Sequence, residues 1–330
     1  MSAPVPDPAG HAGRAAPEVL AIAPIYPPAL EALARRCTVL RDWPGCGEPA
    51  PDGDRARRVR ALVTTGVRGF TAGDLRDRPL LEIVACFGQS HGTLDLTAAR
   101  ARGIVVTNTP DWTESAVADV ALGLLLGTMR RLAEADRFVR AGRWEAGPFP
   151  LSTDLRGKTC GIVGMGAIGR AIARRAAAFD MRIAWHGPRD KPDAPGVWRP
   201  RLIELARESD CMVIACASTP QTRGMVDARV LDALGPGGFL VNVSRGAIVD
   251  EAALIAALAE GRLGGAGLEV FADEPRVPPA LRAMDQVMLV PHLGSSTREI
   301  RARRQACWLD SLQAHFDGQP VPHRVDLTGY

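Results

Sequence analysis

Three glycines stand in the spacing Gly-x-Gly-x-x-Gly, at Gly164, Gly166 and Gly169, between an apolar run at Thr159 to Val163 and a helical pattern. In that context the first glycine permits a tight turn, the second lets the backbone approach a phosphate, and the third lets helix and strand pack closely. The spacing alone is a weak signal, because glycines often mark plain turns. Between a strand and a helix it predicts a dinucleotide site, with the pyrophosphate on the N–H groups of the helix N-terminus.

The residues about 20 positions further on bear on which dinucleotide is bound. Enzymes that use NAD usually place an acidic residue there, against the ribose 2′-hydroxyl. Here the predicted strand Arg182 to Trp185 is followed by His186, Gly187, Pro188 and Arg189, with no acid before the arginine. A 2′-phosphate would be tolerated and could pair with Arg189, so the sequence favours NADP, with NAD possible. Arg189 could equally be a solvated loop residue.

Arg245, Glu274 and His292 lie just after three further strand-like runs. The carboxyl ends of strands line the ligand crevice of a doubly wound sheet, so these side chains could converge despite their separation in the chain. Arginine binds a carboxylate with two hydrogen bonds, and histidine transfers protons near neutral pH. A glutamate beside the histidine favours its protonated form. The set suits hydroxy-acid chemistry, although each residue alone could be an ordinary surface Arg, loop Glu or capping His.

The sequence predicts two series of alternating strands and helices that would position these candidate site residues. A chain of 330 residues is long enough for roughly two domains. The first series has predicted strands at Val19 to Ile22, Ala61 to Thr65, Glu82 to Phe87 and Ile104 to Thr107, with helices at Ala29 to Arg36 and Leu94 to Ala101. Apolar strands separated by helices indicate a parallel sheet covered on both faces. A long helix capped by Thr113 should follow, running to about Ala141 with its apolar side chains at helical spacing: Val117, Val120, Leu124, Met129 and Leu132.

The second series begins near Leu155 and fits a doubly wound nucleotide-binding fold. Its predicted strands are Thr159 to Val163, Arg182 to Trp185, Cys211 to Cys216, Phe239 to Val243, Ala266 to Val270 and Val287 to Val290. The helix after the glycine motif should bury one face, formed by Ile168, Ile172, Ala176 and Phe179. Asp250 should cap a helix over Glu251 to Glu260, and Thr297 to Phe316 should be a last helix that packs on the first half.

Composition excludes several classes of protein. The formal charge of +3 comes from 40 basic and 37 acidic residues, which gives no reason to expect a nucleic-acid partner. No apolar run approaches the ~20 residues of a membrane span. The segment Met1 to Pro17 is rich in Ala, Pro and Gly and lacks the basic and apolar regions of a signal peptide, and we expect it to be a disordered tail. The seven cysteines form no C-x-x-C pair and the six histidines no metal motif, so we expect reduced packing thiols, a cytoplasmic protein and no metal.

From about Val19 onward the chain resembles the D-isomer-specific 2-hydroxyacid dehydrogenases. "NVSRGAIVD", "GLEVFADEP" and "PHLGSST" match the family's arginine, glutamate and histidine motifs, and two longer stretches, "TPDWTESAVADVALGLLLGTMRRL" and "LRGKTCGIVGMGAIGRAIA", also match. The nearest subgroup is the bacterial glyoxylate/hydroxypyruvate reductases, which tend to prefer NADPH. The resemblance implies an α/β protein of two doubly wound parallel-sheet domains. A Rossmann NAD(P)-binding domain over 112–296 would be inserted into a flavodoxin-like substrate domain of residues 18–111 and 297–330.

The resemblance also implies roles for individual residues. His292 would be the proton donor, Glu274 its partner, and Arg245 the group that binds the substrate carboxylate and carbonyl. Contacts to the cofactor would come from Gly166, Ala167, Ile168, Cys216, Ala217, Ser218, Thr222, Val243, Ser244, Arg245, Glu269, His292 and Gly294. The family usually has Asp where Glu269 stands, contacting the nicotinamide carboxamide, so that contact would be shifted by one methylene.

A second departure concerns the substrate. The family's substrate loop usually reads Phe-Gly-Val-Gly-Tyr-Asp, whereas this chain has Phe87, Gly88, Gln89, Ser90, His91 and Gly92. Gln89 and Ser90 would bind the substrate through backbone N–H groups, and a serine in place of glycine loses conformational freedom. The change leaves the identity of the 2-oxo acid open.

The predicted activity is NAD(P)H-dependent reduction of a small 2-oxo acid, glyoxylate or hydroxypyruvate, to the 2-hydroxy acid. Two alternatives stay open: a non-catalytic NAD(H)-sensing interaction protein, and a dehydrogenase of another 2-hydroxy acid such as phosphoglycerate. A formate dehydrogenase is disfavoured, because those relatives usually carry Gln at the position of Glu274. The resemblance further implies a homodimer, in which Trp144 either reaches the partner's active site or packs locally.

Overall fold

The computed structural model describes residues 16–88, 93–110 and 112–330. The chain divides into two compact units: unit 1 comprises residues 1–111 and 298–330, and unit 2 comprises 112–297. Unit 2 is therefore inserted between the two segments of unit 1. Its limits differ by one residue from the insertion of 112–296 expected from the sequence.

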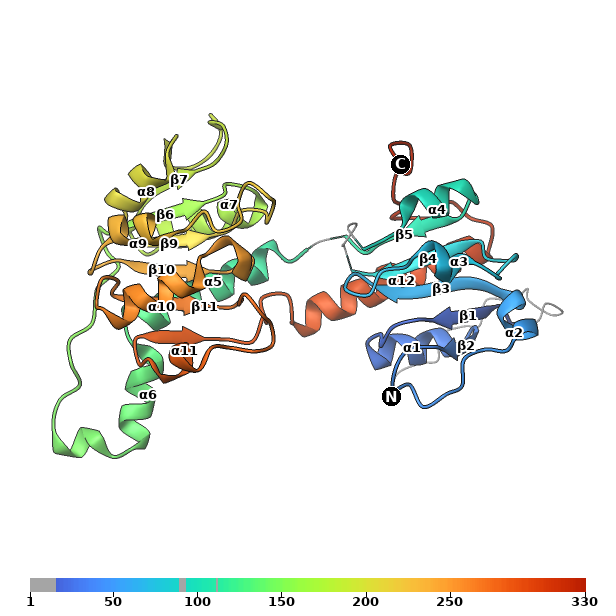
Figure 1. Cartoon of the computed structure of the whole chain (residues 1–330), viewed down its shortest axis with the longest axis horizontal. Helices are drawn as coiled ribbons and strands as arrows, with labels where there is room; N and C mark the ends of the chain where they lie inside the picture. The colour runs from blue at the N-terminus through green and yellow to red at the C-terminus, as the bar shows by residue number, and fades with distance from the viewer. Residues whose placement is uncertain (1–15, 89–92, 111) are drawn as a thin grey trace, which may run out of the picture. The chain divides into compact units, whose positions relative to one another are not determined.

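Unit 1 is built on a five-stranded sheet in the order β2-β1-β3-β4-β5 (Figure 1). The strands are β1 Glu18–Ala21, β2 Thr38–Arg41, β3 Val59–Thr65, β4 Ile83–Phe87 and β5 Val105–Thr107. Every pairing is parallel. This order is the flavodoxin-like arrangement, which confirms the predicted fold of this half.

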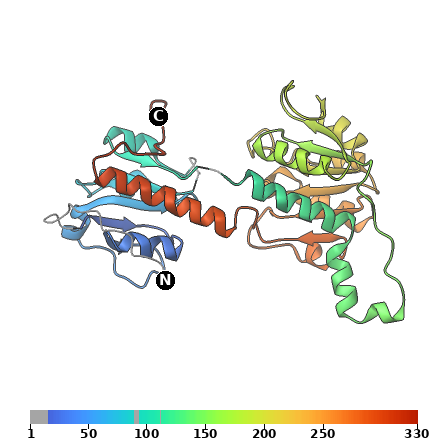
Figure 2. The same ribbon diagram turned by 180° about the vertical axis from the view of Figure 1, so that it is seen from behind.

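Helices cover both faces of the unit 1 sheet. The helices of unit 1 are α1 Pro27–Ala34, α2 Gly53–Arg58, α3 Ala72–Leu75, α4 Leu96–Ala101 and α12 Arg298–Phe316, and all except α2 contribute buried side chains to its core. One face packs against α1 and α12, and the other against α3 and α4. Figure 2 shows α12 lying along its face of the sheet. Trp308 of α12 is buried there, donates a hydrogen bond of 3.2 Å to the carbonyl of Ala85, and contacts the ring of Phe87 edge-on, so the last helix packs on unit 1 as expected.

Unit 2 contains a seven-stranded parallel sheet in the order β12-β11-β10-β9-β6-β7-β8. The strands are β6 Thr159–Val163, β7 Arg182–His186, β8 Val197–Arg199, β9 Cys211–Ile214, β10 Phe239–Asn242, β11 Gly265–Leu268 and β12 Val287–Leu289. Read from β8, the order turns back at β6, which gives the Rossmann strand order with one added strand. The ligand crevice of such a sheet lies at this switch point, beyond the carboxyl ends of the strands.

Helices cover each face of this sheet in one layer, and one further helix projects from the unit (Figure 2). The covering helices are α5 Glu114–Met129, α7 Ala167–Ala177, α8 Leu202–Glu208, α9 Ala228–Leu234, α10 Glu251–Ala259 and α11 Pro279–Ala283, with short 3-10 turns at Arg143–Ala146 and Gly246–Ile248. The projecting helix is α6 Leu132–Arg140, which has no buried residue. Helices α5 and α7 cover one face, and α8 to α11 cover the other. Asp250 caps α10 as predicted, accepting a hydrogen bond of 3.0 Å from the amide of Ala253.

Two strands were not expected from the sequence, β2 and β8. Each lies at one edge of its sheet. An edge strand is buried less than a central one, and neither β2 nor β8 is a continuous apolar run. The pattern that reveals a buried parallel strand is therefore missing from both.

The single long helix expected over Thr113 to Ala141 is wrong. It divides into α5 and α6 at Arg131, which takes the left-handed conformation with φ of 54°. The Arg131 guanidinium bonds both carboxylate oxygens of Glu134 and lies over the ring of Phe149. Thr113 is the residue before α5, but its side chain accepts no capping hydrogen bond, contrary to the prediction. Leu132, which was expected on the apolar face of the long helix, is 53% exposed.

The predicted apolar face after the glycine motif is also partly wrong. Helix α7 ends at Ala177, so Phe179 lies beyond it and is exposed, whereas Ile172 and Ala176 are buried as expected.

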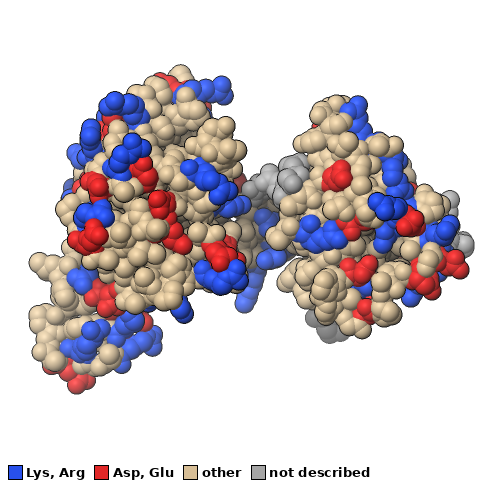
Figure 3. Space-filling model, viewed as in Figure 1, with Lys and Arg blue, Asp and Glu red and all other residues tan. Residues whose placement is uncertain are grey.

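The described residues can be compared with what the sequence predicted for the charge of the surface, for membrane spans and for the N-terminal tail. On the face seen in Figure 3, acidic and basic side chains are interspersed over each unit. Within the part of the chain that the structure describes, no helix combines the length and apolar character that crossing a membrane requires. Most of the expected tail, residues 1–15, lies outside the described residues, and Pro17 at its end accepts a hydrogen bond of 3.0 Å from the amide of Thr38.

Candidate active site

The loop between β6 and α7 needs its three glycines for different steric reasons. Gly164 has φ of +98°, and a Cβ there would meet the backbone nitrogen of Cys216 at 2.6 Å. A Cβ on Gly169 would meet the carbonyl oxygen of Gly164 at 2.0 Å. A Cβ on Gly166 would meet nothing within 4 Å and would project into the open space at the start of α7. The loop therefore has the cradle that a pyrophosphate fits, with Ala167 and Ile168 opening the helix.

A cavity of about 950 Å³ lies beside this loop, at the carboxyl ends of β6, β7 and β9. Four residues predicted to bind the cofactor line it, namely Gly164, Cys216, Ala217 and Thr222. Thr222 fixes the turn after β9, because its hydroxyl accepts the amide of Thr219 at 2.8 Å and donates to the carbonyl of Ala217 at 2.9 Å. Ser218 is exposed on the same turn. Burial raises the pKa of the Cys216 thiol, so that side chain is a neutral part of the wall.

The segment after β7 carries the basic residues that could meet a 2′-phosphate. Arg189 is exposed, while His186 and Pro188 line the cavity. Lys191, which the sequence reasoning missed, donates a hydrogen bond of 2.8 Å from Nζ to the carbonyl of Met165, inside the glycine loop. The signal was available in the sequence, as a second cation two residues after Arg189. An ion pair of 3.0 Å between Arg170 and Asp193 further ties this segment to α7.

His292 and Glu274 form the pair expected from their motifs. The Nδ1 atom of His292 lies 2.7 Å from Oε2 of Glu274. The other oxygen of Glu274 accepts the amide of Phe271 at 3.1 Å, so the carboxylate is oriented from both sides. Because Nδ1 faces the carboxylate, the Nε2 atom is the one left to exchange a proton with a substrate.

Arg245 follows β10 on a loop that is fixed by its neighbours. The Asn242 side chain donates to the carbonyl of Arg245 at 3.1 Å and accepts the amide of Ser244 at the same distance, and the Ser244 hydroxyl donates to the carbonyl of Cys216. A Cβ on Gly246 would meet the backbone of Phe271 at 2.0 Å, so the loop packs directly on the segment that leads to Glu274. Val243 is buried at the base of the loop, and the Arg245 side chain is exposed.

Glu269 directly follows β11 and is only 2% exposed. Its Oε1 atom accepts the amide of Gly294, and among the described residues its buried Oε2 atom has no hydrogen-bond partner. Burial raises the pKa of Glu269, against the amide of Gly294 and the positive charges of His292 and Arg245. All four predicted charged residues belong to unit 2 and lie on the segments that follow β10, β11 and β12.

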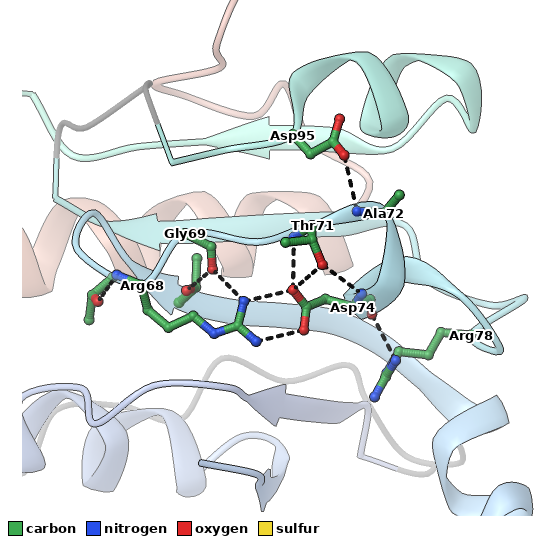
Figure 4. Close-up of polar contacts among 9 residues, drawn as sticks. Arg68, Gly69, Thr71, Ala72, Asp74, Arg78 and Asp95 are labelled. Carbon is green, nitrogen blue, oxygen red and sulfur yellow. Dashed lines mark hydrogen bonds and ion pairs between the residues drawn. The ribbon is translucent and has the colours of Figure 1, made fainter. Parts of the chain in front are cut away.

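Gln89 and Ser90, the predicted substrate contacts, lie outside the described residues. The structure describes what flanks them: the Thr93 hydroxyl donates to the carbonyl of Gly66 at 2.8 Å, and Phe70 donates to the carbonyl of Thr93 at 3.1 Å. The neighbouring loop after β3 is in turn held by Asp74, which binds the Arg68 guanidinium with both oxygens and closes a capping box with Thr71 (Figure 4).

Comparison with known proteins agrees with this geometry. Residues 122–294 match the family model described as the NAD binding domain of the D-isomer specific 2-hydroxyacid dehydrogenases. The chain is 44% identical to glyoxylate/hydroxypyruvate reductase A of Arabidopsis thaliana, over 88% of this chain and 92% of that one. It is also 44% identical to hydroxyphenylpyruvate reductase of Plectranthus scutellarioides, over 81% of this chain and 85% of that one.

A solved structure has the same fold over almost the whole chain. It is the NADPH-dependent glyoxylate/hydroxypyruvate reductase of Sinorhizobium meliloti in complex with NADP and malonate, with a TM-score of 0.79 and 39% identity over 96% of this chain and 98% of that one. The chain therefore belongs to the D-isomer-specific 2-hydroxyacid dehydrogenase family. It is an NAD(P)-dependent oxidoreductase that acts on a 2-oxo or 2-hydroxy acid.

Two glycines of the loop should separate cofactor binding from folding. We expect Gly166→Val to keep the thermal stability of the protein, because the added atoms enter open space, and to raise the Kd for NADPH about tenfold or more by filling the cradle. Gly169→Ala should instead lower the free energy of unfolding by roughly 1–3 kcal/mol, because its Cβ meets a backbone oxygen. Fluorescence titration and calorimetry measure the two effects. Equal NADPH affinity in Gly166→Val and the unmodified protein would show that the cradle lies elsewhere.

Proposed function

We propose that the enzyme reduces glyoxylate and hydroxypyruvate to their 2-hydroxy acids, with NADPH as the preferred reductant and His292 as the proton donor. The observation that carries the proposal is the contact of 2.7 Å between His292 Nδ1 and Glu274 Oε2, on neighbouring loops with Arg245. The relative in Arabidopsis and the solved structure from Sinorhizobium, both named glyoxylate/hydroxypyruvate reductases, support this choice of substrates.

In this mechanism each side chain has a defined task. The Arg245 guanidinium binds the substrate carboxylate and carbonyl oxygen, and stabilises the negative charge that develops on that oxygen. The glycine loop of Gly164, Gly166 and Gly169 would hold NADPH, which would supply the hydride that C2 of the substrate receives. His292 donates the proton on Nε2 to the carbonyl oxygen, which becomes the hydroxyl. Glu274 holds the imidazole through Nδ1 and balances its positive charge until the proton leaves.

The substrate is tested by steady-state reduction of glyoxylate, hydroxypyruvate, pyruvate, 4-hydroxyphenylpyruvate and 3-phosphohydroxypyruvate with each cofactor. We expect the highest kcat/KM with glyoxylate or hydroxypyruvate. The aromatic acid is included because a relative of equal identity is named a hydroxyphenylpyruvate reductase. A preference for it, or for the phosphorylated acid, would replace the proposed substrate and keep the reaction. Absence of turnover with every acid would favour the NAD(H)-sensing alternative.

With His292 as the proton donor, we expect opposite pH profiles for reduction of the 2-oxo acid and oxidation of the 2-hydroxy acid. Reduction requires protonated His292, so its kcat/KM should fall in alkali, while oxidation requires the neutral ring and should rise with pH. We expect His292→Ala to lower kcat at least ~10²-fold and to remove this shared ionisation. Glu274→Gln should move the alkaline fall of reduction to lower pH, because a neutral amide no longer supports the imidazolium. An unmoved profile in Glu274→Gln would mean that the 2.7 Å contact does not influence the proton donor.

The preference for NADPH rests on the segment after β7, which has no carboxylate between Trp185 and Arg189 and offers Arg189 and Lys191 on either side of Asp190. Lys191 lies against the glycine loop through its bond to Met165, so it supports the same preference. NAD remains a possible cofactor.

We expect Arg189→Asp to lower the ratio of kcat/KM for NADPH over NADH by about ten- to a hundredfold, since a charged hydrogen bond contributes roughly 1.5–3 kcal/mol. Pro188→Asp should shift the ratio in the same direction. Arg174→Asp is the matched control, because Arg174 is an exposed arginine on α7 of the same unit, and it should leave the ratio unchanged. Equal or better efficiency with NADH in the unmodified enzyme would refute the preference.

We also propose a homodimer that forms through unit 2. Helix α6 and the loop that follows it project from the rest of the unit (Figure 1). Their exposed apolar side chains are Leu132, Val139, Trp144 and Leu151, and such a concentration marks an interaction surface. Sedimentation should show a dimer that dissociates in Val139→Asp/Leu151→Asp. A fully active monomer in the unmodified protein would exclude it. The cytoplasmic location stays a prediction of the sequence.

A further inference from the structure

We propose that Glu269 is a positioning residue for the proton donor: its buried carboxyl group binds the amide of Gly294 and thereby fixes the loop that presents His292. The inference rests on His292 acting as the proton donor. It assigns to Glu269 a task different from the contact with the nicotinamide carboxamide that the family resemblance implies.

The main chain of Glu269 already holds one side of that loop. Its carbonyl accepts the amide of His292 at 3.0 Å, and its own amide donates to the carbonyl of Asn242 at 3.1 Å. One residue earlier, the carbonyl of Leu268 accepts the amide of Val290 at 2.9 Å. The proton donor thus stands at the point where the pairing of β11 and β12 ends.

The side chain of Glu269 holds the other side. Oε1 accepts the amide of Gly294, two residues beyond His292. The fit is close, because a Cβ on Gly294 would lie 2.7 Å from Oε1 and 3.0 Å from Oε2. Carbonyl and carboxyl of one residue therefore bind the amides on either side of Leu293, and they clamp the turn that carries the imidazole.

The clamped turn needs support, because His292 has φ of +45°. A residue other than glycine is strained in this left-handed region and persists there only where its surroundings determine the conformation. A small relaxation of this backbone would carry the ring away from Glu274, and a displacement of about 1 Å at a catalytic group can cost 10²-fold in rate.

The length of the side chain matters more here than its charge. Glu269 is 2% exposed, its Oε2 atom has no partner among the described residues, and burial raises its pKa, so the site does not favour a bare carboxylate. The charged groups that act on it are His292, Glu274 and Arg245. An aspartate would keep the charge but fall one methylene short of the Gly294 amide. A glutamine would keep the reach and the acceptor oxygen without the charge.

The test compares these two substitutions in the full-length enzyme. We expect Glu269→Asp to lower kcat at least about 20-fold and to move the alkaline fall of reduction to lower pH, since the ring leaves Glu274. Glu269→Gln should stay within about fivefold of the unmodified kcat with an unmoved profile. Both should keep the Kd for NADPH. Gly294→Ala should repeat the loss of kcat, because its Cβ displaces the carboxyl group.

The matched control is Glu208→Asp, which shortens a glutamate of α8 whose Oε2 accepts a hydrogen bond of 2.7 Å from Arg199 and whose buried Oε1 also has no hydrogen-bond partner among the described residues. It should leave kcat and the pH profile unchanged. The reverse order of effects, with Glu269→Gln moving the profile and Glu269→Asp silent, would assign the role to charge and overturn the proposal. A changed Kd for NADPH with unchanged kcat would make Glu269 a cofactor ligand instead. His292→Ala separates the two hypotheses, because an alkaline fall that survives in it refutes the proton donor itself.

Discussion

The chemistry of unit 2 depends on one constraint, the parallel pairing of β9, β10, β11 and β12 as consecutive neighbours. Asn242 pairs with Leu268, and Leu268 pairs with Leu289, so the last residues of three strands meet at one edge. Glu269 directly follows the end of β11, and Arg245 and His292 each lie three residues past the ends of β10 and β12. Helix α5 packs closely on this sheet, because a Cβ on Gly267 would meet Leu124 of α5 at 2.9 Å. The sheet therefore converts distant sequence positions into one cluster of charges.

Much of this arrangement follows from the sequence. Apolar runs of four or five residues predicted the central strands, and the rule that parallel strands end at one edge predicted that Arg245, Glu274 and His292 converge. What escaped prediction depends on contacts with distant residues. Arg131 breaks the α5–α6 run although nothing in its local sequence disfavours a helix, because Glu134 and Phe149 stabilise its left-handed conformation. Lys191 reaches the glycine loop through a hydrogen bond to the carbonyl of Met165, a contact that no local pattern indicates.

Glu269 and Glu274 show why residue type alone does not assign a role. They are five positions apart, yet the side chain of Glu274 is 34% exposed and faces an imidazole, whereas Glu269 is almost fully buried and faces a backbone amide. Which one meets the ring depends on the turn between them, where the amide of Phe271 binds Glu274. A motif can indicate that two acids accompany a histidine, but only the packing of the loop distinguishes their environments.

The two acids constrain different degrees of freedom of the same residue. Glu274 sets the orientation and charge of the imidazole through Nδ1, while Glu269 receives the backbone amides around it. Neither constraint substitutes for the other, because an oriented ring on a relaxed turn points to the wrong place, and a fixed turn leaves the ring free to rotate. The strained backbone of His292, the proposed proton donor, is consistent with this division, since strain persists only where several contacts determine one conformation. The rigidity of the sheet edge is thus transmitted to the one atom, Nε2, at which the proposed proton transfer takes place.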